Sequence, residues 1–235
     1  MELPKSKSVP VSSLQAMTIL VYGRPKIGKS TFCSQAPGAI FLATEPGLHS
    51  LSVHQLPITD WAGLLEACNL LAAGKHEFQT IVIDTVDLAF RMCERQVCED
   101  NGIKHVADLK WGKGYALANN EFFRVMTKLG HMPYGVILTS HAVQFEVDDR
   151  TGKFMRTMPT LGPKARDIVT GMADMIMFAD VEHSKDSKTG AFTERRVLRT
   201  QPSKFWDAGD RTGRLPDTVD LGWAAFVKAF EGGAK

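Results

Sequence analysis

Residues 23–30 match the phosphate-loop pattern G-x-x-x-x-G-K-[ST] at every fixed position. The apolar run at 18–22 just before them predicts a buried strand, and a helix is expected from about Ser30 onward. In this context, backbone N–H groups and a helix N-terminus surround an anionic phosphate chain. The alternative is a chance match in a glycine-rich turn, against which the preceding strand argues. We interpret the stretch as a nucleotide site.

Each position of this loop has an expected role. Lys29 would contact the β- and γ-phosphates, and the Ser30 hydroxyl would be a ligand of Mg²⁺, so ATP and Mg²⁺ are the expected cofactors. Asp84 ends the apolar run 81–83 and is expected to hold the Mg²⁺-bound water, which makes Ser30 and Asp84 the predicted metal residues. The predicted nucleotide-binding residues are Gly23, Arg24, Pro25, Lys26, Ile27, Gly28, Lys29, Ser30 and Thr31.

A carboxylate that orients the attacking water is not found directly after Asp84, where the sequence has Thr85. Glu45 is the best remaining candidate, because it follows another apolar run at the edge where open α/β sheets bind ligands. A solvated loop glutamate before Pro46 is the alternative. No guanine-recognising N-K-x-D occurs, which argues against a GTPase.

Alternating apolar runs and helical patterns predict a parallel α/β sheet covered on both faces. We expect a flexible N-terminal arm over residues 1–14 and one domain over 15–235. The expected segments are strands at 39–43, 80–84 and 135–139, helices at 60–74, 87–99, 115–129 and 221–230, long loops at 144–163 and 201–216, and a hairpin of strands 175–179 and 195–200 around a turn at 186–190.

The composition is that of an ordinary globular chain of 235 residues, 44% hydrophobic and 23% charged, with no transmembrane run or signal peptide. A cytoplasmic protein is expected. The four cysteines lack C-x-x-C spacing, so we expect reduced thiols and no metal beyond Mg²⁺.

The net charge is +2 and the basic excess falls within residues 150–214, which favours an anionic partner or a solvated surface.

The order of these motifs resembles that of RecA-type recombinases: phosphate loop, Glu45, Asp84, then a strand that ends in Ser140 and His141. The chain is more similar to phage-encoded RecA-like ATPases, some of which act as single-strand annealing proteins. Segments 111–116 and 208–216 look like those of that family, and the resemblance covers about residues 15–230. It implies a RecA-like P-loop NTPase core: a mainly parallel sheet with helices on both faces and a C-terminal hairpin.

The resemblance also implies roles for single residues. The catalytic residues would be Lys29, Glu45 as the water-activating group, and His141 as the sensor that couples the γ-phosphate to DNA. Segments 100–113 and 142–165 correspond to two DNA-binding loops, which combine cations for phosphates with aromatic rings for stacking. Surface loops with a tucked-in aromatic are the alternative, and Asp148 and Asp149 weaken the electrostatic case. The predicted DNA-binding residues are Lys110, Trp111, Lys113, Arg150, Lys153 and Arg156.

Lys204 and Arg211 are candidate trans-acting cations that reach a neighbour's γ-phosphate in a homo-oligomer; salt-bridged structural cations are the alternative. We expect an ATPase, stimulated by single-stranded DNA, that promotes phage recombination or strand annealing, with a single-strand binding protein as a further partner and no membrane partner. Two alternatives stay open. One is an ATP-fuelled accessory protein for helicase loading or packaging, and the other is a small-molecule kinase with 144–163 as its lid.

Overall fold

The phosphate-loop strand lies inside a large sheet of the computed structural model, which describes residues 3, 5–7, 13–185 and 192–233. Its helical elements are η1 (Leu14–Ala16), α1 (Lys29–Ser34), α2 (Trp61–Ala72), α3 (Val86–Asp100), η2 (Val106–Asp108), η3 (Lys110–Gly112), α4 (Lys113–Gly130), α5 (Pro163–Met172) and α6 (Trp223–Gly232). Its strands are β1 (Thr18–Gly23), β2 (Ala39–Ala43), β3 (His54–Pro57), β4 (Thr80–Asp84), β5 (Gly135–Asp149), β6 (Gly152–Pro159), β7 (Met175–Lys185), β8 (Phe192–Arg199), β9 (Gly209–Asp210) and β10 (Thr218–Asp220).

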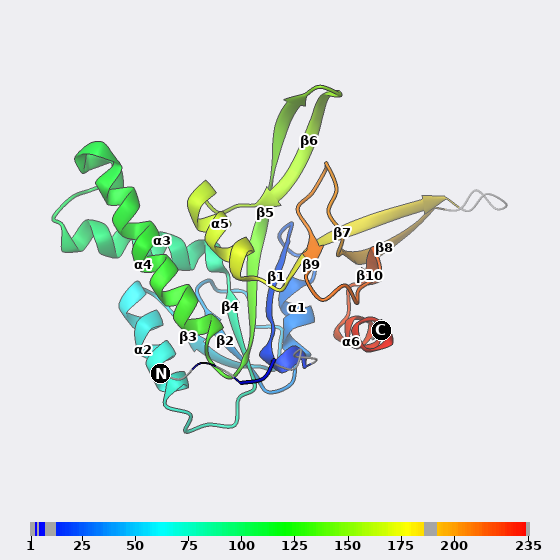
Figure 1. Ribbon diagram of the computed structural model, residues 1–235, viewed down its shortest axis with the longest axis horizontal. Coiled ribbons are helices and arrows are strands. Elements are labelled where there is room, and N and C mark those ends of the chain that lie inside the picture. Colours follow the sequence, from blue (N-terminus) through cyan, green and yellow to red (C-terminus); the bar gives the residue numbers. More distant parts are fainter. Residues whose placement is uncertain (1–2, 4, 8–12, 186–191, 234–235) are drawn as a thin grey trace.

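The strand order is β10-β8-β7-β1-β5-β4-β2-β3, with β6 added to β5 and β9 added to β7 (Figure 1). From β3 to β7 all neighbours on this path run parallel, and β8 and β10 extend the sheet in the antiparallel sense. The carboxyl ends of β1, β2, β4 and β5 therefore point to one edge of the sheet, which is where the candidate residues lie. The predicted fold class, a mainly parallel α/β sheet with a C-terminal hairpin, is confirmed.

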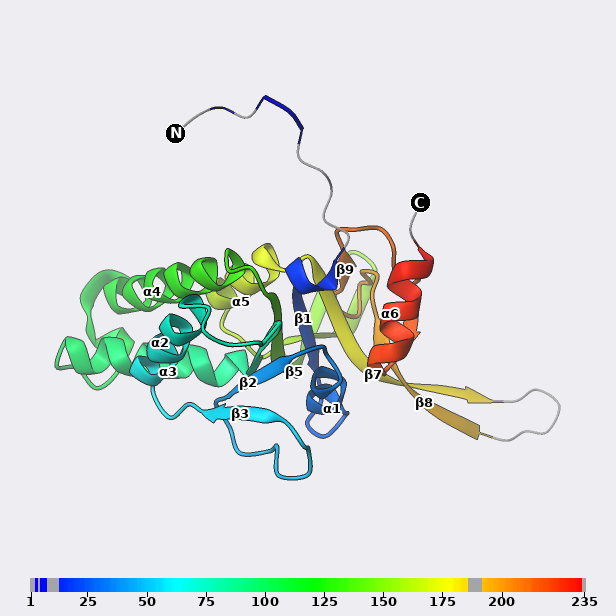
Figure 2. The ribbon, with the colours of Figure 1, turned by 90° about the horizontal axis from the view of Figure 1, so that it is seen from below.

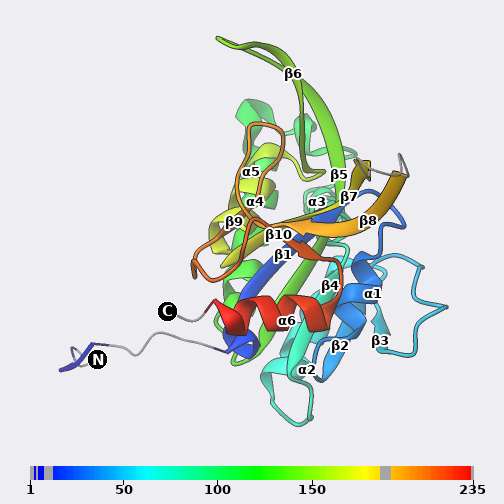
Figure 3. The same cartoon turned by 90° about the vertical axis from the view of Figure 1, so that its right-hand side faces the viewer.

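Successive residues of each central strand point to opposite faces and build two separate cores. Leu20, Leu42 and Ile83 pack with α2–α5 on one face. On the other face, Val21 and Phe41 pack with α1 and α6. Figures 2 and 3 show this division, with α6 on the same side of the strands as α1. Both faces are covered, which explains why these strands are continuous apolar runs in the sequence.

Two antiparallel hairpins extend from the parallel core. β7 and β8 pair from Phe178 with Arg199 to Lys185 with Phe192, which confirms the predicted C-terminal hairpin; its predicted turn at 186–190 lies outside the described residues. The predicted long loop at 144–163 is wrong. β5 continues to Asp149 and pairs with β6, and the resulting hairpin projects beyond the carboxyl edge of the sheet (Figure 1).

Several shorter elements were absent from the sequence prediction: β3, β9, β10 and the helix α5, which begins with Pro163 at its first position. The predicted arm at 1–14 lies in part outside the described residues and stays a prediction, although Leu14 begins η1 and Ser13 caps it. Within the described ranges, no helix is both long and apolar enough to cross a membrane.

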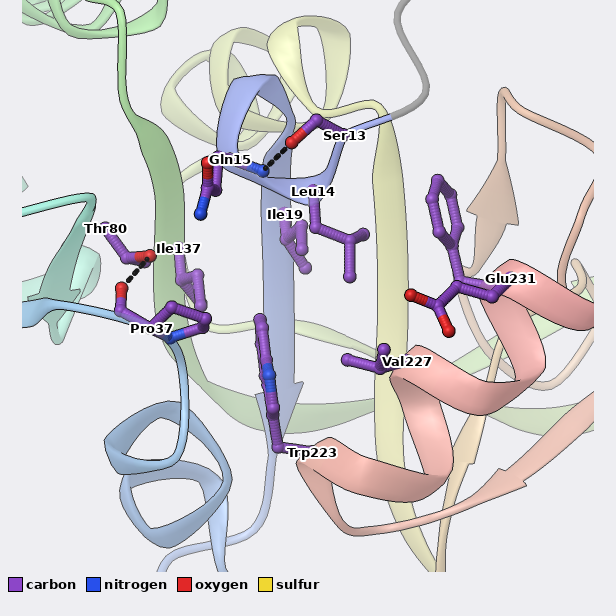
Figure 4. A pocket seen from close by; sticks show the side chains of 11 residues that line it. Ser13, Leu14, Gln15, Ile19, Pro37, Thr80, Ile137, Trp223, Val227 and Glu231 are labelled. Carbon is purple, nitrogen blue, oxygen red and sulfur yellow. Dashed lines mark hydrogen bonds between the residues drawn. The ribbon is translucent and has the colours of Figure 1, made fainter.

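A cavity of about 370 Å³ lies at the opposite, amino-terminal end of the central strands (Figure 4). Ile19 and Ile137 form its floor, Leu14 covers one side, and Trp223 and Val227 of α6 form the other. Because Ile19 and Ile137 are the second or third residues of β1 and β5, this cavity is separate from the phosphate loop, which follows the last residue of β1.

Candidate nucleotide site

The phosphate loop connects β1 to α1, and glycine is required at two of its positions. A Cβ at Gly23 would stand 2.6 Å from the carbonyl oxygen of Ala179 on the neighbouring strand β7. Gly28 has φ +117°, a left-handed conformation that side chains disfavour, and it directly precedes the first residue of α1. Close approach to Ala179 therefore explains glycine at position 23, and the left-handed conformation explains glycine at position 28. The loop has the strand–loop–helix setting that the sequence predicts.

Lys29 is buried at the start of α1. Its Nζ donates to the carbonyl oxygens of Gly23, at 3.0 Å, and Arg24, at 3.2 Å, so the ammonium lies against its own loop. Burial lowers the pKa of Lys29, while the carboxylates of Asp84 and Glu45 act in the opposite direction. The loop thus holds a buried cation with two carboxylates nearby, an arrangement that suits a polyphosphate with its metal ion.

Ser30 and Asp84 are 54 positions apart in the chain and are brought together at the carboxyl edge of the sheet. Ser30 Oγ donates to Asp84 Oδ2 at 2.7 Å, and Thr139 Oγ1 donates to Asp84 Oδ1 at 2.5 Å. Thr139 reaches Asp84 because β5 is the parallel neighbour of β4. A hydroxyl and a carboxylate side by side are the hard oxygen ligands that Mg²⁺ prefers, so these residues fit the expected ion.

Glu45 and His141 come from two different strands of the same edge. Glu45 follows β2, His141 lies in β5, and the His141 Nε2 to Glu45 Oε2 distance is 3.4 Å. Both side chains are about one-third exposed, at 32% for Glu45 and 30% for His141, so each is accessible from solvent. The structure therefore brings together Lys29, Ser30, Asp84, Glu45 and His141 of the predicted site residues.

Asp87 is a site residue that the sequence indicates only as the start of a helix. It lies buried in the first turn of α3, where Oδ1 accepts from Ser140 Oγ and Oδ2 from the backbone N–H of His141, both at 2.6 Å. Burial raises the pKa of Asp87, and these hydrogen bonds lower it. Asp87 thus fixes the backbone that carries His141. Its position three residues after Asp84 is the only sequence signal that could have indicated it.

A threonine pair ties β2 to β4 beside this site. Thr44 Oγ1 donates to the carbonyl oxygen of Thr85 at 2.8 Å, and the Thr85 N–H donates back to Thr44 Oγ1 at 2.7 Å. These contacts fix Thr44, the residue before Glu45, relative to Thr85, the residue after Asp84. The peptide bond between Asp84 and Thr85 is cis. The two strand ends are therefore held in register.

The predicted DNA-binding residues lie on two separate elements. Lys110 and Trp111 lie between α3 and α4, and Lys113 begins α4; all three are exposed, Trp111 fully. In the β5–β6 hairpin, Arg150 is exposed in the turn and Lys153 pairs with Glu146 at 2.9 Å. Arg156 pairs with Asp207 and is only 34% exposed.

The two candidate trans-acting cations have partners within their own chain. Lys204 Nζ lies 5.1 Å from the ring centroids of Phe154 and Phe205. Arg211 pairs with Asp174 at 3.1 Å, and the Asp174 N–H donates to the carbonyl oxygen of Thr18 at the amino end of β1, opposite the phosphate loop. The described residues include no group of three or more His, Cys, Asp or Glu that could hold a metal ion.

Comparisons with known proteins show what the chain is similar to. A family model described as "AAA domain" matches residues 15–212, most of the chain. The chain belongs to this AAA domain family. A curated relative, the SPbeta prophage-derived uncharacterized protein YorG of Bacillus subtilis (strain 168), is 25% identical over 199 residues, or 82% of this chain. The chain spans 57% of the length of that relative.

A similar solved structure is the KaiC-like protein PH0186 from Pyrococcus horikoshii OT3. It has a TM-score of 0.45 and 14% sequence identity, and the match covers 79% of each chain. For this chain, the family match and the phosphate-loop geometry together establish a P-loop ATPase domain.

Proposed function

We propose that this chain is a Mg²⁺-dependent, RecA-type ATPase that binds single-stranded DNA and promotes phage recombination or strand annealing. The prophage origin of one relative supports the phage setting. The host cytoplasm is then the proposed location, and a single-strand binding protein is a further proposed partner.

In this proposal, different residues of the chain carry out different parts of ATP hydrolysis. Lys29 and the loop N–H groups hold the β- and γ-phosphates of ATP, and Ser30 and Asp84 hold Mg²⁺. The ion supplies charge neutralisation on the phosphates. Glu45 orients the attacking water, and His141, 3.4 Å away, senses whether that end of the site is occupied.

The observation that carries the proposal is the position of His141 at the root of the β5–β6 hairpin. Its backbone N–H is fixed by Asp87, its ring faces Glu45, and the next residue, Ala142, makes the first hairpin pair, with Pro159. A change in the Glu45–His141 contact acts directly on the strand that forms the hairpin. Nucleotide binding and hairpin position are therefore coupled through adjacent residues of one strand.

A cavity of about 600 Å³ supports the same coupling. Arg24 of the phosphate loop lines it together with Gln144 and Met155 of the hairpin and with Phe178 and Trp206. The hairpin and the loop thus share one hollow, and a ligand that contacts the hairpin there also contacts the nucleotide-binding loop.

The proposed DNA surface combines a stacking ring with cations that have no acidic partner among the described residues. Trp111 offers both faces of its ring, and Lys110, Lys113 and Arg150 are exposed. Lys204 and Arg211 remain proposed as cations that act on a neighbouring subunit, which requires that assembly breaks their present contacts.

Binding of a labelled single-stranded oligonucleotide at several salt concentrations, with and without ATP, tests the proposal. We expect affinity that falls with salt, because Lys and Arg displace counterions from phosphates, and tighter binding with ATP. No affinity at low salt in either nucleotide state would refute the DNA-binding function and leave the ATPase assignment intact.

The hairpin also favours a second candidate, an ATP-fuelled accessory protein for helicase loading or packaging. Lys153 and Arg156 are neutralised by Glu146 and Asp207, whereas Phe145 and Met155 are 46% and 48% exposed. A neutralised, partly apolar surface suits a protein partner better than a phosphate backbone. The small-molecule kinase alternative rested on a long loop at 144–163; because this segment forms a hairpin and α5, we do not propose a kinase.

A further inference from the structure

Arg196 of β8 lies against the phosphate loop. Its Nη1 atom is 3.7 Å from the point where a Cβ at Gly28 would stand, and Leu221 Cδ2 is 3.4 Å from the same point. The backbone is fixed there, because the Leu221 N–H donates to the Arg196 carbonyl oxygen at 2.9 Å. Since Gly28 directly precedes Lys29, a guanidinium group stands beside the loop residues that are expected to hold phosphate.

The neighbouring arginines of β8 are paired, and Arg196 is not. Arg195 contacts Glu182 at 2.6 Å and Asp220 at 3.4 Å, and Arg199 contacts Asp180 and Glu182. Arg196 is exposed and has no hydrogen bond or ion pair with another described side chain. Its guanidinium is therefore available to a ligand.

Arg196 also belongs to a cationic hollow of about 310 Å³ beside the loop. Arg24 and Lys26 line it from the loop, and neither has an ion pair among the described residues. The single acidic residue on its wall, Glu194, pairs with His183 at 3.2 Å. Four cationic residues, Arg24, Lys26, Arg195 and Arg196, line this hollow against one carboxylate, so it favours an anion.

We propose that Arg196 binds a phosphate group of the nucleotide in cis, from the side of the loop opposite to Asp84. The inference rests on the proposed ATP binding. Arginine suits this role because its planar guanidinium makes two parallel hydrogen bonds to phosphate. The nucleotide is the favoured source of that phosphate, rather than DNA, because Arg196 lies beside the phosphate loop itself and lines one hollow with it.

Calorimetric titration with Mg²⁺-ATP and with inorganic tripolyphosphate tests the inference on four proteins: wild type, Arg196→Gln, the control Arg124→Gln, and Lys29→Ala. We expect Arg196→Gln to weaken both ligands about 10- to 100-fold, as for a lost hydrogen bond to a charged group. Arg124→Gln should change both affinities less than about twofold, because Arg124 pairs with Glu121 on α4 and does not line the hollow. Equal thermal unfolding of the variants checks the fold.

Three results would overturn the inference. Unchanged affinities in Arg196→Gln would show that Arg196 does not touch the nucleotide. Weaker ATP binding with unchanged tripolyphosphate binding would place the contact on the base or ribose. Weaker oligonucleotide binding with unchanged ATP binding would assign Arg196 to DNA. A wild-type chain without affinity for ATP would instead refute the proposed function, and the inference with it.

Discussion

At the scale of single residues, Lys29 is a buried cation that donates, within the described part of the chain, to two carbonyl oxygens of its own loop. Lys29→Ala should abolish ATP binding, because the remaining loop N–H groups lack the charge that compensates the phosphates. Calorimetry measures the loss of binding, and circular dichroism checks that the fold is intact. Hydrolysis by Lys29→Ala at the wild-type rate would mean that the nucleotide binds elsewhere.

The roles of Glu45 and Asp84 should become distinguishable when each carboxylate is replaced by its amide. Glu45→Gln keeps the phosphate contacts and should bind ATP normally, but it should hydrolyse ATP about 10²- to 10⁴-fold more slowly. Asp84→Asn should instead raise the Mg²⁺ concentration needed for half-maximal turnover, because an amide is a weaker ligand. Unchanged turnover in Glu45→Gln would mean that another residue orients the attacking water.

Only part of this site could be predicted from single residues. The pattern at 23–30 and the strand-end position of Asp84 follow from the order of residues along the chain. Thr139 and Asp87 do not, because their roles depend on which strands are neighbours: Thr139 reaches Asp84 across the β4–β5 pair, and Asp87 reaches His141 from α3. Arg196 was missed for the same reason, since it contacts the loop from β8.

At the scale of elements, the α3–α4 connection and the β5–β6 hairpin should contribute differently to DNA binding. Trp111→Ala should weaken single-strand binding by about 1–3 kcal/mol with little change in salt slope, because the stacking of one base is removed. Lys110→Ala with Lys113→Ala should lower the slope by about 0.7 for each phosphate that is no longer neutralised. Fluorescence anisotropy across a salt series measures both quantities.

Lys153→Ala is the matched control for this series, because Lys153 already pairs with Glu146. It should leave the salt slope nearly unchanged. A slope that falls with Lys153→Ala and stays constant in the Lys110 and Lys113 double variant would move the DNA surface to the hairpin.

The helix α6 should stabilise the fold by covering the face of the sheet that carries α1. Phe226 is fully buried, with its ring centroid 5.7 Å from that of Phe32 in α1. Phe226→Ala should lower the free energy of unfolding by about 3–5 kcal/mol, since a large buried ring leaves a cavity. Exposed Lys228→Ala on the same helix should change it by less than about 0.5 kcal/mol. Urea denaturation measures the free energy of unfolding of both variants. Equal effects would contradict the packing of Phe226 against α1.

The hairpin shows why one element was predicted wrongly. Its strands carry many polar side chains, such as Gln144 and Glu146, because both faces of a projecting two-stranded hairpin meet solvent over much of their length. Strand prediction from apolar runs succeeds where the sheet is covered, as for residues 80–84, and fails where it is not.

At the scale of the whole molecule, the parallel sheet gathers distant parts of the chain at one edge. The phosphate loop and Glu45 follow strands there, Asp84 ends one, and His141 lies within β5 where the β5–β6 hairpin starts (Figure 1). A net charge of only +2 gives little overall attraction to nucleic acid, so the proposed DNA binding requires local cations and stacking.

In the proposed function, DNA bound outside the nucleotide site changes ATP hydrolysis inside it. The most direct test is the steady-state rate of ATP hydrolysis with and without saturating single-stranded DNA, with Lys29→Ala as the inactive control. We predict Mg²⁺-dependent turnover that rises several-fold with single-stranded DNA and is absent in Lys29→Ala. Hydrolysis that is equally fast with and without DNA would contradict the account.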